Sequence, residues 1–314
     1  CQPLAVALSS PLSGWILDAW KSSSLEATTG LANWRAMLIL EGALPFLWLP
    51  IWIYFINDHP RQARWISTAE RAHVESILVR EAAELEPGRP EPFWRALLRR
   101  QVLVMLVIYF FQNCGAYGCM FWLPSALKHA QGLRLSNTLI GLLFAGPYVL
   151  GAILMILHAR HSDRTRERRG HVAAALGWGG AFFLAGVLSR SHSAWLSYAC
   201  ICVAITGPFC SLAPFWAIPT ETLPRGVAGS AMGLINAMGN LGGFAGPFLV
   251  GYLDKVTGNF TYGFGLLGVA LLLGAAMATL ITPAVPLAAP QSSTSPPPSP
   301  SLPLDTPTPR SPIA

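Results

Sequence analysis

Long apolar stretches follow one another along almost the whole chain, and they constrain its fold more than any other feature. Seven of them reach the length of a membrane-crossing helix, for which about 20 apolar residues are enough. They occupy residues 35–57, 102–127, 138–158, 172–189, 194–218, 227–253 and 261–282. An eighth stretch, 3–17, looks too short to cross. Because the chain opens at Cys1, we expect a fragment whose first helix is cut partway.

The composition agrees with a membrane protein and excludes an ordinary soluble domain. Hydrophobic residues make up 53% of the chain and charged residues only 11%, and the mean hydropathy is +0.46. Apolar spans of this length are typical of helices that cross a bilayer. The sequence therefore predicts an all-α integral membrane protein in contact with the lipid bilayer.

Basic residues cluster in particular loops. Eight arginines lie in 58–100 and five in 160–170, whereas the intervening loops hold few Lys or Arg. Basic loops are typical of the cytoplasmic side of a membrane, so the net charge of +6 does not indicate nucleic acid as a partner. Alternation over seven crossings places 58–100, 160–170, 219–226 and the C-terminal tail inside the cell.

These spans and loops divide the chain into four parts. Residues 1–57 hold two helices, the first truncated; 58–101 form a cytoplasmic loop, and 102–282 a six-helix unit. Ser67 to Glu70 has the pattern of a capping box, and apolar residues follow at helical spacing up to Leu85, which predicts a surface amphipathic helix. Residues 283–314 are rich in Pro, Ser and Thr, which predicts a disordered cytoplasmic tail.

The most unusual stretch is 209–251, where two spans meet at a polar elbow, 219–225. Its second span carries glycines four residues apart, and this spacing lets helices approach closely in lipid. Asn236 and Asn240 are also four apart, so both amides point the same way. An unpartnered amide is costly in lipid, which leaves two interpretations: hydrogen bonds between helices, or a substrate pathway. The glycine pairs are Gly229 and Gly233, Gly239 and Gly243, and Gly242 and Gly246.

Polar side chains also occur in two earlier spans. Tyr109, Asn113 and Tyr117 share one helix face, which suits either solute binding or the packing of aromatic rings near the membrane boundary. Glu41 is the only carboxylate well inside a span. It is either a functional group or the structural hydrogen-bond partner of a neighbouring helix.

The loop after residue 158 combines an acid with spaced arginines. Asp163 could lie at a helix N-terminus, where the helix dipole favours a carboxylate. Arg164 or Arg168 could pair with Glu221 in the elbow. These four residues would then form a conformational latch at the inner side. The simpler interpretation is the positive charge of an inner loop, which explains the arginines but not the aspartate.

Several of these motifs together resemble the major facilitator superfamily, and within it the anion:cation symporter branch that carries organic anions. Asp163-Arg164 followed by Arg168-Arg169 is similar to the superfamily's inner-loop motif, although Ala159 replaces the usual glycine. Residues 34–42 and 58–71 resemble the sixth helix and central loop of that branch, and 215–221 and 236–243 resemble its tenth and eleventh helices. The likeness covers residues 1–282.

The resemblance implies a major facilitator-type helical bundle to which this chain contributes helices five to twelve of twelve. In related sugar-acid transporters the proton-coupling carboxylates and a substrate-binding arginine lie in helices one to four. The resemblance also implies which positions of this chain face the substrate cavity. They are Tyr109, Asn113, Trp216 and Asn236, with Asn240 beside them.

We therefore expect a monomeric secondary active transporter of the bacterial inner (plasma) membrane. It would move a small organic anion, a sugar acid or carboxylate, together with a proton by alternating access. The alternatives are a non-transporting or inactive membrane fragment and an intramembrane enzyme, and neither an HExxH nor a GxSxG motif supports the enzyme. The cysteines and histidines lack zinc-like spacing, so no metal, cofactor or catalytic residue is predicted.

Overall fold

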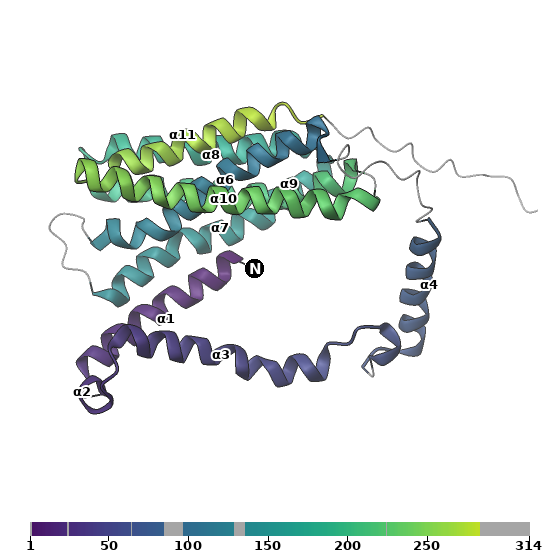
Figure 1. Cartoon of the computed structure of the whole chain (residues 1–314), viewed down its shortest axis with the longest axis horizontal. Coiled ribbons are helices and arrows are strands. Elements are labelled where there is room, and N and C mark those ends of the chain that lie inside the picture. Colours follow the sequence, from purple (N-terminus) through teal and green to yellow (C-terminus); the bar gives the residue numbers. More distant parts are fainter. Residues whose placement is uncertain are drawn as a thin grey trace, which may run out of the picture. The chain divides into compact units, whose positions relative to one another are not determined.

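The computed structural model describes residues 2–23, 25–63, 65–84, 97–128, 136–223 and 225–282, and the regular structure in these ranges is helical (Figure 1). The predicted disordered tail, 283–314, lies outside the described residues. The elements are α1 (Gln2–Ser22), α2 (Leu25–Thr29), α3 (Asn33–Phe55), the 3-10 helix η1 (Pro60–Gln62), α4 (Thr68–Glu84), α6 (Arg100–Lys128), α7 (Asn137–Thr165), α8 (Arg169–Ser189), α9 (Ala194–Thr222), α10 (Arg225–Thr257) and α11 (Thr261–Ala278).

Six helices of the described part are long and apolar enough to cross a membrane: α3, α6, α7, α8, α9 and α11. They correspond to six of the seven predicted spans. Helix α10 covers the seventh and is longer still, at 33 residues. It does not reach the same hydropathy because asparagines and many glycines interrupt its apolar residues. These same residues set α10 apart as a helix built for packing and polar contact.

The first helix is longer than the sequence predicts. The first apolar stretch of the sequence ends at residue 17, but α1 continues to Ser22 and α2 follows at Leu25. Asp18 lies in this extension, and its carboxylate accepts hydrogen bonds from Asn137 Nδ2 at 2.8 Å and from the backbone amide and hydroxyl of Thr138 at 2.7 and 2.6 Å. A carboxylate at the start of α7 satisfies amides that the helix itself leaves unpaired.

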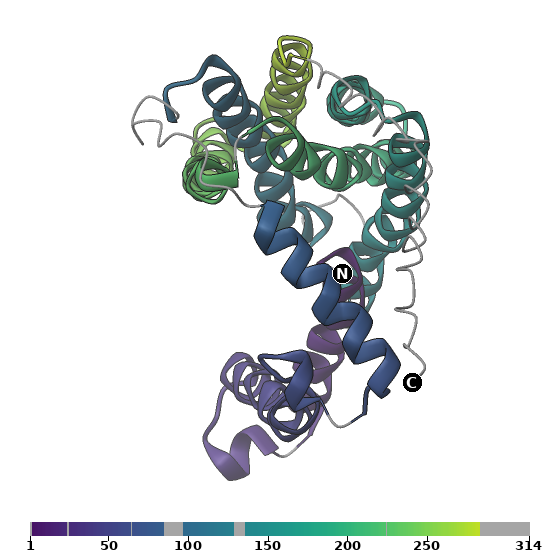
Figure 2. The same cartoon turned by 90° about the vertical axis from the view of Figure 1, so that its right-hand side faces the viewer.

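Helices α6 to α11 pack side by side, with α10 against α6, α9 against α8, and α11 against both α6 and α8 (Figure 1). Helix α7 contacts α9, and α1 contacts α7. Figure 2, turned by 90°, shows several of these helices closer to end-on. The fully buried large side chains of this part of the chain come from α6, α7, α8, α9, α10 and α11: Met105, Ile108, Leu123, Tyr148, Leu176, Phe183, Phe215, Ile235, Leu267 and Leu271.

The glycine-rich face of α10 allows it to lie directly on α6. A Cβ added to Gly242 or Gly246 would collide with the backbone carbonyl of Phe110 or Cys114. This confirms the predicted close approach for the later glycine pairs. It does not hold for Gly229 and Gly233, around which an added Cβ would meet nothing within 4 Å.

Glycine mediates the other close crossings as well. An added Cβ at Gly207 of α9 would fall 2.8 Å from the Cα of Gly179 on α8, and one at Gly180 of α8 would fall 2.6 Å from the carbonyl oxygen of Gly268 on α11. Small residues permit such contacts between helices that gain little from the hydrophobic effect inside a bilayer.

Helix α3 packs against α1, and Glu41 takes part in that contact. Its carboxylate accepts a hydrogen bond from the Ser13 hydroxyl of α1. Of the two interpretations of Glu41, a functional group or a structural hydrogen bond to a neighbouring helix, this bond is the one that the second requires. Much of the apolar surface of α3 is exposed, including Phe46, Leu47 and Ile53.

Two segments on the predicted cytoplasmic side test the local patterns. Helix α4 begins at Thr68, and Ser67 Oγ accepts the Glu70 amide at 3.2 Å, which is the serine half of a capping box. Leu85 lies outside the described residues. The elbow is shorter than predicted, because α9 continues through Pro219 to Thr222 and α10 begins at Arg225.

Candidate functional site

The first cluster of predicted binding residues lies where α6 meets α9. The Tyr109 ring of α6 stacks on Phe215 of α9, with centroids 5.2 Å apart and planes 13° from parallel. It meets the Trp216 ring edge-on at 5.1 Å. The structure therefore brings Tyr109 and Trp216 into contact, and Tyr109 but not Trp216 lines the cavity described next.

Asn113 lies one helical turn beyond Tyr109 and is buried, with 6% of its surface exposed. Tyr109, Asn113 and Tyr117 line a small cavity of about 40 Å³ whose other wall comes from α9, at Pro208, Phe209 and Leu212. The shared face predicted from their spacing thus borders one cavity. No residue that lines it carries a charge, within the part of the chain that the structure describes.

Gln112 is a member of this cavity that the sequence analysis did not select. Its side chain is 1% exposed, and Nε2 donates to the Pro208 carbonyl oxygen at 3.1 Å. Its Oε1 is buried and has no hydrogen-bond partner among the residues that the structure describes. A buried amide oxygen without a partner is costly, so this acceptor suits a donor from water or from a solute. The sequence did contain a signal for Gln112, because a glutamine deep within an apolar span is unusual.

Helix α10 borders the same cluster through Gly239. A Cβ added there would collide with the Tyr109 ring and lie 2.5 Å from Asn113 Nδ2. The neighbouring Asn240, and Asn236 one turn earlier, are both exposed, and neither forms a hydrogen bond with another described residue. The sequence left two interpretations of these asparagines, hydrogen bonds between helices or a substrate pathway. Within the described residues, neither asparagine forms a hydrogen bond to another helix.

The second cluster lies at the predicted cytoplasmic loops 160–170 and 219–226, where α7 ends, α8 begins and α9 ends. Arg168 Nη1 is 2.6 Å from Asp163 Oδ1, and Arg168 Nη2 is 3.0 Å from Glu221 Oε1. Arg168 Nε donates to the same Glu221 oxygen at 3.1 Å. One guanidinium thus ties the ends of three helices together, and it also bonds the buried Ser162 hydroxyl at 3.1 Å.

The three charged groups of this cluster differ in burial. The Arg168 side chain is only 17% exposed, whereas Asp163 and Glu221 are 67% and 38% exposed. Burial alone would lower the pKa of Arg168, but the hydrogen bonds and charges of Asp163 and Glu221 outweigh it and raise that pKa above its ordinary value. The guanidinium therefore stays charged.

The structure chooses between the two candidate arginines and corrects the position of Asp163. Asp163 lies near the C-terminus of α7, not at a helix N-terminus. Arg166, with φ of 52°, ends α7 in a left-handed turn, and the chain then presents Arg168 to Glu221. Arg164 forms no ion pair with a described residue.

The carboxylate at the start of α8 is Glu167. It accepts the Gly170 amide at 2.5 Å and the His171 amide at 3.1 Å. Burial alone would raise the pKa of Glu167, but these bonds and the His171 ring outweigh it and lower the pKa below its ordinary value. A carboxylate does lie at a helix N-terminus in this loop, as the helix-dipole argument expected, but it is Glu167 and not Asp163.

Three histidines also meet at this end, two from the last turns of α7 and one from the first turn of α8. His161 Nδ1 is 2.7 Å from His171 Nε2, and His158 Nε2 is 3.1 Å from the His171 carbonyl oxygen. Across the described residues no group of three or more His, Cys, Asp or Glu is arranged to hold a metal ion.

Comparison with known families decides what kind of bundle this is. Residues 1–247 match the model of the Major Facilitator Superfamily. The chain belongs to the major facilitator superfamily. As a member with six apolar helices of spanning length, it is an integral, multi-pass membrane protein.

Its relatives within the superfamily are named as transporters. A "Putative tartrate transporter" of Agrobacterium vitis is 31% identical over 291 residues, 91% of this chain and 61% of the relative. A "Quinolone resistance transporter" of Acinetobacter baumannii is 32% identical over 87% of this chain and 61% of the relative. A "Probable sulfoacetate transporter SauU" of Cupriavidus necator is 28% identical over 80% and 58%. The chain thus spans about three fifths of the length of these superfamily members.

Proposed function

We propose that the full-length gene product containing this chain is a secondary active transporter of a small organic anion, a sugar acid or carboxylate. It would carry its substrate with a proton, by alternating access, as a monomer in the bacterial inner membrane. The observation that carries the proposal is the amide and tyrosine cavity between α6 and α9 in a superfamily whose relatives here are named for tartrate and sulfoacetate.

The chemistry of the cavity suggests what this half of the protein contributes. Its polar side chains are neutral: the amides of Gln2, Gln112 and Asn113 and the phenols of Tyr109 and Tyr117. Neutral amides and phenols bond hydroxyls and carboxylate oxygens, but they do not neutralise a full charge. We therefore infer that this chain binds the hydroxyls and orients the anion. The countercharge and the proton carrier would come from other helices of the complete transporter.

Asn236 and Asn240 fit the same role. They lie on α10 beside the glycine face that contacts Tyr109 and Asn113, and both amides are exposed with no described partner. An exposed amide on a helix of a membrane protein favours a wet cavity over lipid. In the proposal these amides form the second wall of the binding site.

The Arg168 cluster supports the alternating-access part of the proposal. Its charged groups come from the ends of α7, α8 and α9, and the described ion pairs of Arg168 involve no residue that lines the cavity. A cluster at helix ends can favour one arrangement of the helices over another without touching solute. We assign to Asp163, Arg168 and Glu221 the role of the latch, and we leave Arg164 outside it.

Uptake measurements test the function. The full-length protein is reconstituted into vesicles and supplied with labelled tartrate, sulfoacetate, succinate or a quinolone, with and without an inward proton gradient. We expect accumulation of at least one hydroxylated carboxylate, loss of accumulation when a protonophore dissipates the gradient, and weaker uptake by Asn113→Ala. Asn57→Ala, which alters an exposed amide after α3, is the matched control. A correctly inserted protein that accumulates none of the anions would refute the proposal and favour a non-transporting protein.

A further inference from the structure

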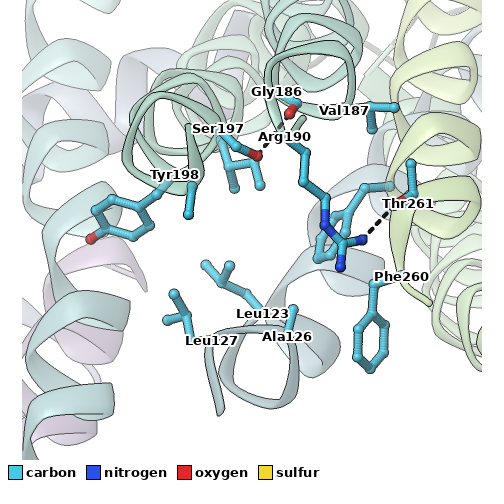
Figure 3. Close-up of a pocket in the computed structure, with 13 residues that line it drawn as sticks. Leu123, Ala126, Leu127, Gly186, Val187, Arg190, Ser197, Tyr198, Phe260 and Thr261 are labelled. Atoms are coloured by element: carbon cyan, nitrogen blue, oxygen red, sulfur yellow. Dashed lines mark hydrogen bonds between the residues drawn. The ribbon is translucent and has the colours of Figure 1, made fainter. Parts of the chain in front are cut away.

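A second cavity lies at the other end of the bundle from Arg168, between the end of α6, the end of α8 and the first turns of α9 and α11 (Figure 3). Its volume is about 120 Å³. The walls are largely apolar, formed by Leu123, Val187, Ile201 and Phe264 among others. We propose that this pocket binds an anionic phospholipid, with the lipid phosphate on Arg190 and acyl-chain carbons against the apolar walls.

Arg190 gives the pocket its charge. It follows the last residue of α8, and its guanidinium reaches into the pocket toward Phe260 and Thr261 (Figure 3). It donates one hydrogen bond, to Thr261 Oγ1, and no carboxylate among the described residues pairs with it. A guanidinium has five N–H donors, so most of them remain available to an anion.

The other polar groups of the pocket are already satisfied. Ser197 Oγ donates to the Gly186 carbonyl oxygen at 2.7 Å, and the Tyr198 hydroxyl donates to the Leu143 carbonyl oxygen at 2.5 Å. Arg190 is the one charged side chain that lines the pocket within the described residues. The pocket therefore presents one strong anion contact beside hydrocarbon surface, which matches a molecule with an anionic head and an apolar tail.

Exposed aromatic residues place Arg190 at the level of lipid headgroups. Trp195 near the start of α9 and Tyr262 near the start of α11 are 60% and 61% exposed, and both lie within five residues of lining residues at the same helix ends. Trp and Tyr are enriched where a membrane meets water. Leu188, in the last turn of α8, is 73% exposed and marks the adjoining lipid-facing surface. A phosphate at this depth would lie beside Arg190 while its acyl chain runs along the helices.

Apolar walls also argue for a lipid over a dissolved anion. A free phosphate would use only the guanidinium and would leave the surfaces of Leu123 and Phe264 unoccupied. A phospholipid would use both, because burying methylene groups adds to the charge-assisted hydrogen bonds. The pocket lies away from the Tyr109 cavity, so the inference does not depend on the identity of the transported solute.

Lipid retention tests the proposal. The full-length protein is purified in detergent with equal amounts of phosphatidylglycerol and phosphatidylcholine, and bound lipid is counted by native mass spectrometry. We expect phosphatidylglycerol to be retained preferentially and Arg190→Gln to lower its retention by about 10-fold, which corresponds to ~1.4 kcal/mol. Arg190→Lys, which keeps the charge but not the planar fork, should give an intermediate value.

Lys255→Gln is the matched control, since Lys255 is an exposed cation in the last turn of α10 that does not line the pocket. It should retain phosphatidylglycerol as the unaltered protein does. The proposal is overturned if Arg190→Gln retains the lipid fully, if Lys255→Gln loses as much, or if excess inorganic phosphate displaces the lipid. The last outcome would identify a site for a dissolved anion.

Discussion

The ion-pair cluster at Arg168 and the cavity at Tyr109 differ in how complete they are within this chain. At the cluster every charged group has its partner: Arg168 holds Asp163 and Glu221 within 3.0 Å. At the cavity Gln112 Oε1 has no partner in the described part of the chain, and Asn236 is exposed. A self-sufficient polar cluster suits a role within the bundle, whereas unsatisfied polar groups beside a cavity suit a solute. We therefore expect changes at the two places to have different consequences.

The largest effect should come from the packing that holds α10 beside the cavity. Gly242→Ala places a methyl group against the Phe110 carbonyl, a backbone atom that cannot move aside easily. We expect a loss of about 1–3 kcal/mol of stability, the usual cost of overpacking. Thermal unfolding of the purified protein measures it.

Gly233→Ala is the control for that experiment, because an added Cβ there meets nothing within 4 Å. It should leave the melting temperature unchanged or raise it, since alanine favours a helix over glycine by up to ~1 kcal/mol. Equal losses in both variants would show that α10 does not pack on α6 as described.

A smaller loss of stability is expected at the ion-pair cluster. Arg168→Gln leaves Asp163 and Glu221 without their shared cation, and we expect a cost of about 1–2 kcal/mol, between that of an exposed and a buried pair. Arg164→Gln, which removes a neighbouring charge outside the cluster, should change the melting temperature little. If the two variants melt alike, the cluster is only part of a generally basic loop.

The exposed amides of α10 should affect affinity rather than stability. Asn236→Ala should weaken substrate binding by roughly 0.5–1.5 kcal/mol, the range for a neutral hydrogen bond, and leave the melting temperature intact. Asn240→Ala removes the second amide, one helical turn away, and it too should affect affinity rather than the melting temperature. A fall in melting temperature with native affinity would assign these amides to contacts between helices instead.

The smallest effect concerns Glu167 and depends on pH. Because its pKa is lowered in the folded protein, the carboxylate stabilises the fold above its unfolded pKa near 4.5, and this contribution is lost as the pH falls through the folded value. Glu167→Gln should therefore lower the free energy of unfolding by about 0.3–1 kcal/mol at pH 7, and with it the melting temperature. The two proteins should converge on acidification, as melting curves at a series of pH values would reveal; a constant difference would contradict the assignment.

The sequence was enough to predict the membrane-spanning helices, because a long apolar segment in a bilayer can adopt few other structures. It missed the continuation of α1 to Ser22, because the residues after position 17 are polar and carry no helix-specific apolar pattern. Spacing along one helix found Tyr109 and Asn113, since residues four apart share a face. It could not select Gln112, whose partner is the Pro208 carbonyl of another helix. Nor could it choose Arg168 over Arg164, because the left-handed turn at Arg166 makes that choice.

A direct comparison of Asn113→Ala and Asp163→Asn in the full-length protein separates the two regions most sharply. Equilibrium binding of labelled tartrate and the rate of its uptake would be measured for both variants. Asn113→Ala should weaken binding by about 2- to 12-fold, the equivalent of 0.5–1.5 kcal/mol. Asp163→Asn, at a carboxylate that is 67% exposed, should keep native binding and slow uptake. Slow uptake with native affinity in Asn113→Ala, or weakened binding in Asp163→Asn, would contradict the division between a binding cavity and a latch.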